Sequence, residues 1–312
     1  RVYRTKVWQL PEASRDARGG HVAGLLSFLP EEHITRVMTL RSYDDAKYLL
    51  LATRAGLVKK TQLTAYDSSR QAGVIAINFR TDDDELIGAE LCGPDDDVLL
   101  ISRKGQAIRF GADDEQLRPM GRVTSGVTGM KFRGDDELLS MSVIEVGTDE
   151  DERFVFTATD GGYAKRTLVS EYRRQGRGGL GIKAMALSED RGSLVGGLAV
   201  QEADEVIAIR TSGQLTRSAV AEVPVKGRST MGVKFVNVRG KDAVSIIALN
   251  PEHEEPDDPQ PGHDEVRGTT QGGGSEARDG ASDEDASTDE DTAGTVVSDE
   301  ASDDAGEHGE QA

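Results

Sequence analysis

The residues best suited to chemistry are concentrated between Tyr172 and Met185, in the sequence YRRQGRGGLGIKAM. Four glycines stand there among three arginines and one lysine. This combination favours phosphate binding, because guanidinium groups donate in pairs to phosphate oxygens and glycine lets a backbone come close to a ligand. Gly176, Gly178 and Gly181 also form the pattern GxGxxG, which is a dinucleotide fingerprint when it joins a buried strand to a helix.

The surrounding residues disfavour a small-nucleotide site. The segment before Gly176 is Glu-Tyr-Arg-Arg-Gln, which is not an apolar strand. A P-loop would need lysine at Ile182, whereas the lysine follows one residue later at Lys183. A nucleotide-binding enzyme that uses this loop therefore stays an alternative, and we favour a different phosphate-bearing ligand.

Catalytic and metal-binding patterns are weak along the chain. The histidines make no ligand cluster, and Cys92 is the one cysteine, so no disulfide is expected. Tyr172 is expected to pack or stack rather than to act as a nucleophile. The acidic clusters between Asp82 and Glu152 are expected to be hydrated turns, with a Mg²⁺ site as the weaker interpretation. We predict no catalytic residue and no metal site.

The elements that must position these residues form a repeat of about fifty residues. Each full copy has an apolar strand, a turn ending in glycine and a second strand with a basic residue four positions after that glycine. These hairpins are 48–61, 98–110, 154–167 and 206–218. Residues 1–4 fit the second strand of an earlier, partial copy. A closing strand ends each copy and begins at Leu86, Leu138, Leu194 or Val244.

A second recurring pattern, R-x-x-x-G followed by an apolar residue, lies about twenty residues after the hairpin glycine. We call these segments the Arg–Gly loops: Arg122–Gly126, Arg177–Gly181, Arg228–Gly232 and the shorter Arg70–Gly73. Short strands bounded by Gly and Asp turns cannot bury their own faces, so the copies must pack on one another. We predict an all-β ring of blades, with partial blade 1–40, four further blades to residue 250, and a tail from 251 to 312.

If the blades form a ring, equivalent cations fall along one rim, where they could hold a bent phosphate polymer without reading bases. Arg173, Arg174 and Arg177 are the first candidates, because they are the densest and the nearest to glycines. The remaining candidates are Lys59, Lys60, Arg70, Arg109, Arg122, Lys131, Arg166, Lys183, Arg217, Lys226, Arg228 and Lys234.

The net charge of −19 does not exclude nucleic acid, because it resides in the tail. Residues 251–312 hold 21 acidic and two basic side chains, whereas residues 1–250 hold 35 of each. The tail also lacks Phe, Tyr and Trp, so we expect it to be disordered. It could solubilise the protein or compete with DNA for the basic rim. The arginine-rich, Asp-rich composition is also compatible with a salt-adapted source.

In the repeated hairpins and Arg–Gly loops, the sequence resembles the C-terminal domain of the A subunit of DNA gyrase, a type IIA topoisomerase. The matching segments include RVYRTKVWQLPEASRDARG, LLLATRAGLVKKTQLTAY and TATDGGYAKRTLVSEYRRQGRGGLGIKAM, and they cover residues 1–250. The resemblance implies a β-pinwheel that binds, bends and wraps duplex DNA without sequence preference, in support of ATP-dependent negative supercoiling by the whole enzyme. It also implies a cytoplasmic, nucleoid-associated protein without membrane contact.

The resemblance further implies partners outside this sequence: the gyrase B subunit and the N-terminal part of the A subunit, which would use ATP and Mg²⁺. No cofactor is expected in this chain. The family's QRRGGKG-like box lies upstream of the segment that Arg1 begins, so we expect a truncated chain and an incomplete ring. Residues 173–181 are a box-like copy, with Leu180 in place of a basic residue. The alternatives are the corresponding domain of topoisomerase IV and a propeller that serves as a protein-interaction scaffold.

Overall fold

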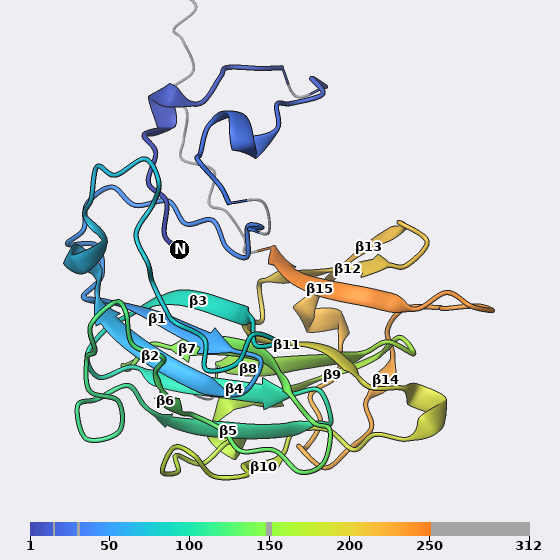
Figure 1. Ribbon diagram of the computed structural model, residues 1–312. Helices are drawn as coiled ribbons and strands as arrows, with labels where there is room; N and C mark the ends of the chain where they lie inside the picture. Colours follow the sequence, from blue (N-terminus) through green and yellow to red (C-terminus); the bar gives the residue numbers. More distant parts are fainter. Residues whose placement is uncertain (15, 30–31, 148–151, 251–312) are drawn as a thin grey trace, which may run out of the picture. The chain divides into compact units, whose positions relative to one another are not determined.

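The repeat folds into four antiparallel sheets (Figure 1). The computed structural model describes residues 1–14, 16–29, 32–147 and 152–250. Each sheet is built on one of the expected hairpins. The hairpins are β1 Tyr48–Thr53 with β2 Leu57–Gln62, β4 Asp97–Ser102 with β5 Gln106–Gly111, β8 Arg153–Thr159 with β9 Tyr163–Leu168, and β12 Glu205–Arg210 with β13 Leu215–Ala219.

The closing strands pair with the first strand of each hairpin. They are β3 Leu86–Cys92, β7 Leu138–Ile144, β11 Leu194–Gln201 and β15 Val244–Asn250. Each begins at the apolar residue that the sequence indicates. The strands β1 and β4 are buried along their whole length, as expected for continuous apolar runs.

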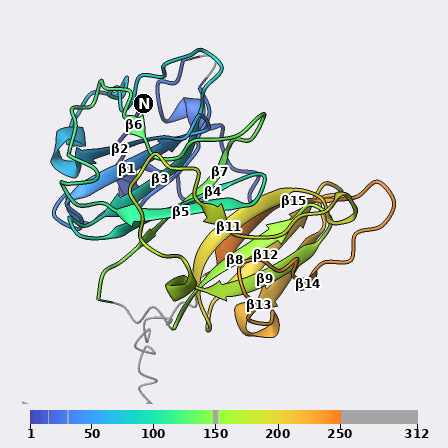
Figure 2. The same cartoon turned by 90° about the horizontal axis from the view of Figure 1, so that it is seen from below.

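The fourth strand of a sheet comes from the next copy of the repeat. The apolar residue after an Arg–Gly loop opens a two-residue strand, and this strand pairs with the preceding hairpin. The exchanged strands are β6 Val127–Thr128 on β2, β10 Ile182–Lys183 on β5, and β14 Val233–Lys234 on β9. Figure 2 shows β14 at the edge of the sheet that contains β9, β8 and β11. Successive copies are therefore linked by backbone hydrogen bonds as well as by packing.

In its described residues, the last sheet holds only three strands, in the order β13-β12-β15. The outer edge of β13 is consequently uncovered. Leu215 is 59% exposed, whereas Val58, Ala107 and Ala164 at the equivalent positions are each 0% exposed.

The cores lie between neighbouring sheets, which pack through their closing strands: β3 on β7, β7 on β11 and β11 on β15. One apolar cluster joins the first two sheets around Leu50, Leu100 and Phe110. A second joins the last two around Phe156 and Val206. The prediction of an all-β, propeller-like fold of repeated blades is confirmed.

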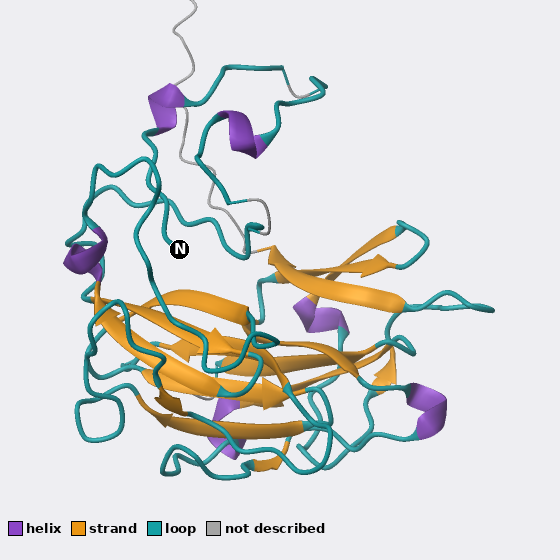
Figure 3. Cartoon of the chain, in the orientation of Figure 1, coloured by secondary structure: helices purple, strands orange, loops and turns teal. Residues whose placement is uncertain are grey.

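The described helices are all short 3-10 turns (Figure 3). They are Val7–Gln9, Val22–Gly24, Leu63–Tyr66, Val169–Glu171, Glu189–Arg191 and Val220–Glu222. None of the helices in the described ranges is long and apolar enough to cross a membrane.

The partial copy contributes one bridge, in which Val2 pairs with Val74 after the shortest Arg–Gly loop. The expected disordered tail, 251–312, lies outside the described residues.

Candidate nucleic-acid interface

The basic residue four positions after each hairpin glycine is paired inside its own sheet. It contacts the residue diagonally across the hairpin, which is alternately aromatic and acidic. The pairs are Lys60 over the Tyr48 ring at 4.3 Å, Arg109 Nε to Asp97 Oδ2 at 2.7 Å, Arg166 over the Phe154 ring at 4.6 Å, and Arg217 Nε to Glu205 Oε2 at 2.5 Å. The charge periodicity at this position therefore reflects cross-strand pairing.

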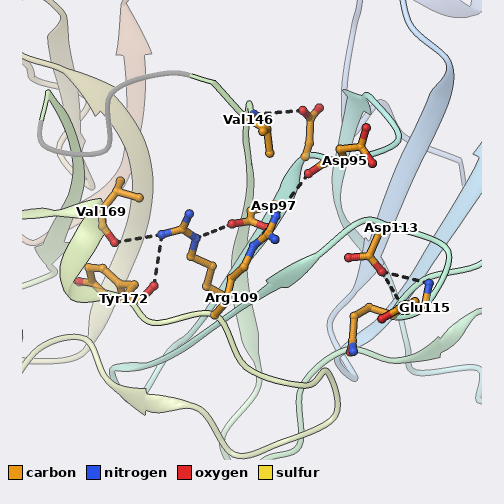
Figure 4. A network of polar contacts seen from close by, with 11 residues as sticks. Asp95, Asp97, Arg109, Asp113, Glu115, Val146, Val169 and Tyr172 are labelled. Carbon is orange, nitrogen blue, oxygen red and sulfur yellow. Dashed lines mark hydrogen bonds and ion pairs between the residues drawn. The ribbon is translucent and has the colours of Figure 1, made fainter.

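Burial removes three of these four residues from the candidate interface. Lys60, Arg109 and Arg166 are 0%, 6% and 7% exposed. Lys60 Nζ also donates to Ala112 O at 2.5 Å, and Arg166 Nε donates to Val223 O at 2.7 Å. Arg109 points toward the carbonyls of Val169 and Tyr172 as well as to Asp97 (Figure 4). Their burial and internal partners disfavour the predicted phosphate contacts of Lys60, Arg109 and Arg166.

Burial also disfavours the predicted phosphate contact of Lys59. Its side chain is 0% exposed, and Nζ donates to the carbonyl oxygens of Ala76, Arg122 and Thr124. Lys165 does the same two copies later, where Nζ donates to Gly227 O at 2.7 Å and Arg228 O at 2.6 Å. Both lysines hold the backbone of an Arg–Gly loop against the preceding hairpin. Burial lowers the pKa of each to about 8.

The Arg–Gly loops are neighbours, joined by a hydrogen bond that recurs from copy to copy. The amide five residues after one loop glycine donates to the carbonyl two residues before the next loop glycine. The bonds are Asn78 N to Thr124 O at 3.3 Å, Lys131 N to Gly179 O at 2.9 Å, and Ala186 N to Thr230 O at 3.1 Å. The loops from Arg70 to Gly232 thus follow one another along a single edge formed by the outer strands.

The loop arginines Arg177 and Arg228 bind the outer strand of the preceding copy along this edge. Arg177 Nη1 donates to Thr128 O on β6, and Arg228 Nη1 donates to Lys183 O on β10, each at 3.1 Å. Thr128 and Lys183 are equivalent residues, two after their loop glycines. An arginine from the next copy therefore satisfies an outer-strand carbonyl, while the Arg177 side chain stays exposed and that of Arg228 partly exposed.

Several predicted residues remain exposed around this edge. Arg70, Lys131, Arg173, Lys183, Lys226 and Lys234 are exposed, and Arg122 and Arg228 are partly exposed. Arg174 and Arg217 are exposed but form ion pairs, with side-chain exposures of 52% and 62%. Within the described ranges, the Arg173 side chain has no hydrogen bond or ion pair.

Three of the exposed predicted residues, Lys131, Lys183 and Arg228, line one open groove of about 530 Å³. Lys104 and Arg133 add two cations that were not predicted from the sequence, and Asp136 is the only carboxylate among the lining residues. Arg133 could have been found from its position two residues after Lys131. Lys104 could not, because the groove brings a hairpin turn beside a loop of the next copy. The groove has a strong excess of positive charge.

The remaining chemical candidates have structural positions. Tyr172 is 1% exposed and packs in a cluster with Val169 and Met185, as expected for a packing residue. Burial raises the pKa of the Cys92 thiol to about 12, which keeps the thiol protonated. Gly181 is followed by strand β10 rather than a helix, so the loop lacks the strand-to-helix geometry of a dinucleotide site. The described ranges contain no cluster of three His, Cys, Asp or Glu residues suited to a metal.

Comparison with known proteins agrees with this geometry. The model of the family described as "DNA gyrase C-terminal domain, beta-propeller" matches residues 1–39, 47–92, 96–145, 153–201 and 204–250. These five segments coincide with the partial copy and the four full copies. The chain belongs to the DNA gyrase C-terminal domain family.

Curated relatives support the membership. The chain is 57% identical over 279 residues to the DNA gyrase A subunit of a Nocardioides species, a match that covers 81% of this chain and 30% of the relative. It is 60% identical over 256 residues to the DNA gyrase A subunit of Streptomyces coelicolor, covering 81% and 29%. The chain thus spans about 30% of these relatives. None of these findings supports the expectation of a salt-adapted source.

Solved structures agree on the fold. The structure of a DNA gyrase A C-terminal domain has a TM-score of 0.65 and 25% identity, and the match covers 75% of this chain and 76% of that one. The C-terminal domain of a DNA topoisomerase IV has a TM-score of 0.70 and 22% identity, covering 78% and 74%. At that identity the second match concerns the fold alone, whereas the curated relatives are gyrase subunits. The gyrase interpretation is therefore the better supported of the two.

Proposed function

We propose that this gyrase C-terminal domain binds duplex DNA without sequence preference along the edge formed by the Arg–Gly loops, and bends it. The observation that carries the proposal is the recurring bond between successive loops, which aligns their cations on one edge. Phosphates at regular spacing match cations at regular spacing, and no base-reading element is required. Bending costs elastic energy that further phosphate contacts along the edge would offset.

In the longer protein, we propose that this bend supports negative supercoiling by presenting DNA to the rest of the enzyme. That enzyme would comprise the N-terminal part of the A subunit together with the B subunit, which use ATP and Mg²⁺. A topoisomerase IV role predicts relaxation or decatenation without strong chiral wrapping. Supercoiling assays of the full enzyme, with and without this domain, separate the two. A protein-interaction scaffold predicts no salt-dependent affinity for DNA.

The direct test is a titration of a duplex of about 40 base pairs at several salt concentrations. If about eight cations engage phosphates, log K falls with log salt at a slope of about −7. The double variant Arg173→Ala/Lys183→Ala should lower the magnitude of this slope by about two and weaken all sequences alike. Lys241→Ala is the control, since Lys241 is exposed but lies outside the Arg–Gly loops and the groove. An unchanged slope in the double variant would contradict the edge as the binding surface.

A further inference from the structure

Asp97 is a buried carboxylate that accepts hydrogen bonds from two guanidinium groups. The residue is 1% exposed, and its Oδ2 accepts from Arg109 Nε at 2.7 Å. Its Oδ1 accepts from Arg174 Nε at 2.6 Å, with Arg174 Nη2 at 2.5 Å. Arg109 belongs to the same hairpin as Asp97, whereas Arg174 comes from the next copy of the repeat. The buried carboxylate therefore links two successive copies.

This contact marks only one of three equivalent junctions in the described chain. At each junction a loop amide donates to the carbonyl of the basic hairpin residue: Met120 N to Lys60 O, Gln175 N to Arg109 O, and Lys226 N to Arg166 O, at 2.7, 2.8 and 2.8 Å. The residues just before these amides are Pro119, Arg174 and Val225. Where Asp97 stands in the second sheet, the first and third sheets have Tyr48 and Phe154. Among these three junctions, an arginine of the docking loop therefore meets a hairpin carboxylate only at the second, where the box-like loop docks.

The anchored arginine fixes the start of the densest cationic loop. Arg174 Nη2 also donates to Asp95 O at 3.3 Å. Three residues further on, Arg177 N donates to Gln116 Oε1 at 3.1 Å, and Gly178 N donates to Gly129 O at 2.6 Å. Between these anchors the backbone has little freedom. The neighbouring Arg173 side chain stays exposed beside the anchored residue.

We propose that Asp97 is a positioning residue for DNA binding, which acts through Arg174 to hold the box-like loop 173–181 in its binding conformation. The inference rests on the proposed function. It assigns Arg174 a different part from the one expected from sequence: the arginine binds the protein, and its neighbours bind phosphate.

The direction in which Asp97→Asn changes the Kd for DNA tests this assignment. Asp97→Asn removes a negative charge near the interface, so simple electrostatics predicts tighter DNA binding. Positioning predicts the opposite, a rise in Kd on the order of tenfold, as expected when a loop's phosphate contacts are lost. Asp135→Asn is the charge-matched control, because the Asp135 side chain is 88% exposed and pairs with Lys104 at the surface. That control should bind DNA as tightly as the unmodified domain or more tightly.

Arg174→Met is the second variant, because it leaves the buried Asp97–Arg109 pair intact if Asp97→Asn proves unstable. It should raise Kd by a similar factor, and the double variant should be no weaker than either single one. Hydrogen exchange at 175–181 should accelerate in both single variants while the amides of β4 and β5 stay protected. Tighter binding by Asp97→Asn, additive losses or unchanged exchange would overturn the inference. Absence of salt-dependent binding by the unmodified domain would instead refute the proposed function. The hydrogen-exchange result would still show whether the Asp97–Arg174 contact holds the loop 175–181.

Discussion

Lys59 and Lys165 place an amino group inside the protein, and every acceptor that the structure gives them is a neutral backbone carbonyl. Sequence alone could not separate them from surface lysines, because both follow a hairpin glycine by three residues in a strongly charged segment. The equivalent residues Ile108 and Thr216 show that the position does not require a cation. What requires the amine is the set of loop carbonyls that would otherwise be buried without donors.

A pH dependence of stability follows from these two lysines. Burial lowers the pKa of each from 10.5 to about 8, so the folded state releases these protons at lower pH than the unfolded state. Between pH 8 and 10.5 the unfolded chain binds more protons, and the free energy of unfolding should therefore rise with pH. Each lysine contributes a slope of at most about 1.4 kcal/mol per pH unit, and nothing below pH 7. Urea unfolding of the unmodified domain and of Lys165→Met across this range measures the contribution as a difference.

Lys241→Met provides the comparison for that experiment, since Lys241 is exposed and should give the same pH profile as the unmodified domain. If Lys165→Met also matched the unmodified profile, the carbonyls would be holding Nζ charged throughout the range.

The acidic turns were only partly predictable at this scale. Two of the clusters expected to be hydrated turns, 82–85 and 135–137, each contain a carboxylate that accepts a hairpin-turn amide: Ala55 N donates to Asp84 Oδ1, and Lys104 N donates to Asp136 Oδ1. In the fourth full copy Asp242, which lies outside those clusters, accepts from Ser212 N in the same way. In the third copy Gly192 replaces the aspartate, and Asp160 of the turn accepts from Ser193 N instead. In this copy the carboxylate lies in the hairpin turn and the amide lies just before the closing strand, the reverse of the other copies. Residue spacing alone does not reveal this exchange.

Among the elements, the hairpins and closing strands could be predicted from sequence because their signals are local. Apolar runs of four to seven residues, bounded by glycine and aspartate, mark both strands and turn. The exchanged strands β6, β10 and β14 have two residues each and pair with a hairpin about seventy residues earlier in the chain. No periodicity survives in two residues, so this pairing depends on tertiary structure. The loop glycines were the one usable signal, since they mark a close backbone approach.

The hairpin glycines allow that close approach to be measured. Gly56 and Gly213 have nearly identical φ angles of 80° and 81°, so alanine would be strained at either position. A Cβ at Gly56 would lie 2.5 Å from Met130 O of the next copy, whereas one at Gly213 would meet nothing within 4 Å. Gly213→Ala should cost about 1 kcal/mol of unfolding free energy, and Gly56→Ala about 2–4 kcal/mol. Equal losses in urea unfolding would show that strand exchange does not constrain the turn.

At the scale of the whole molecule, the domain 1–250 and the tail 251–312 are expected to affect DNA binding in opposite directions. Residues 1–250 are formally neutral, yet the structure gathers Lys104, Lys131, Arg133, Lys183 and Arg228 around one groove. Other arginines form ion pairs with carboxylates of the same domain, for example Arg174 with Asp97 and Arg217 with Glu205. Composition could therefore not point to the proposed interface. The repeat indicated the edge, and the side-chain partners show which of its cations are paired inside the domain.

The tail, residues 251–312, carries a net charge of −19. It is covalently joined to a domain whose proposed interface is cationic. We expect such a chain to compete with DNA for the same cations at low salt, and the competition to weaken as the Debye length falls from about 30 Å at 0.01 M to about 8 Å at 0.15 M. Deletion of 251–312 should therefore lower the Kd for DNA at low salt and change it little at 0.3 M. A full-length variant with the tail's Asp and Glu replaced by Asn and Gln should behave like the deletion, because it removes charge but not chain length. If the neutralised tail left DNA affinity at the unmodified value at every salt concentration, electrostatic competition would be excluded.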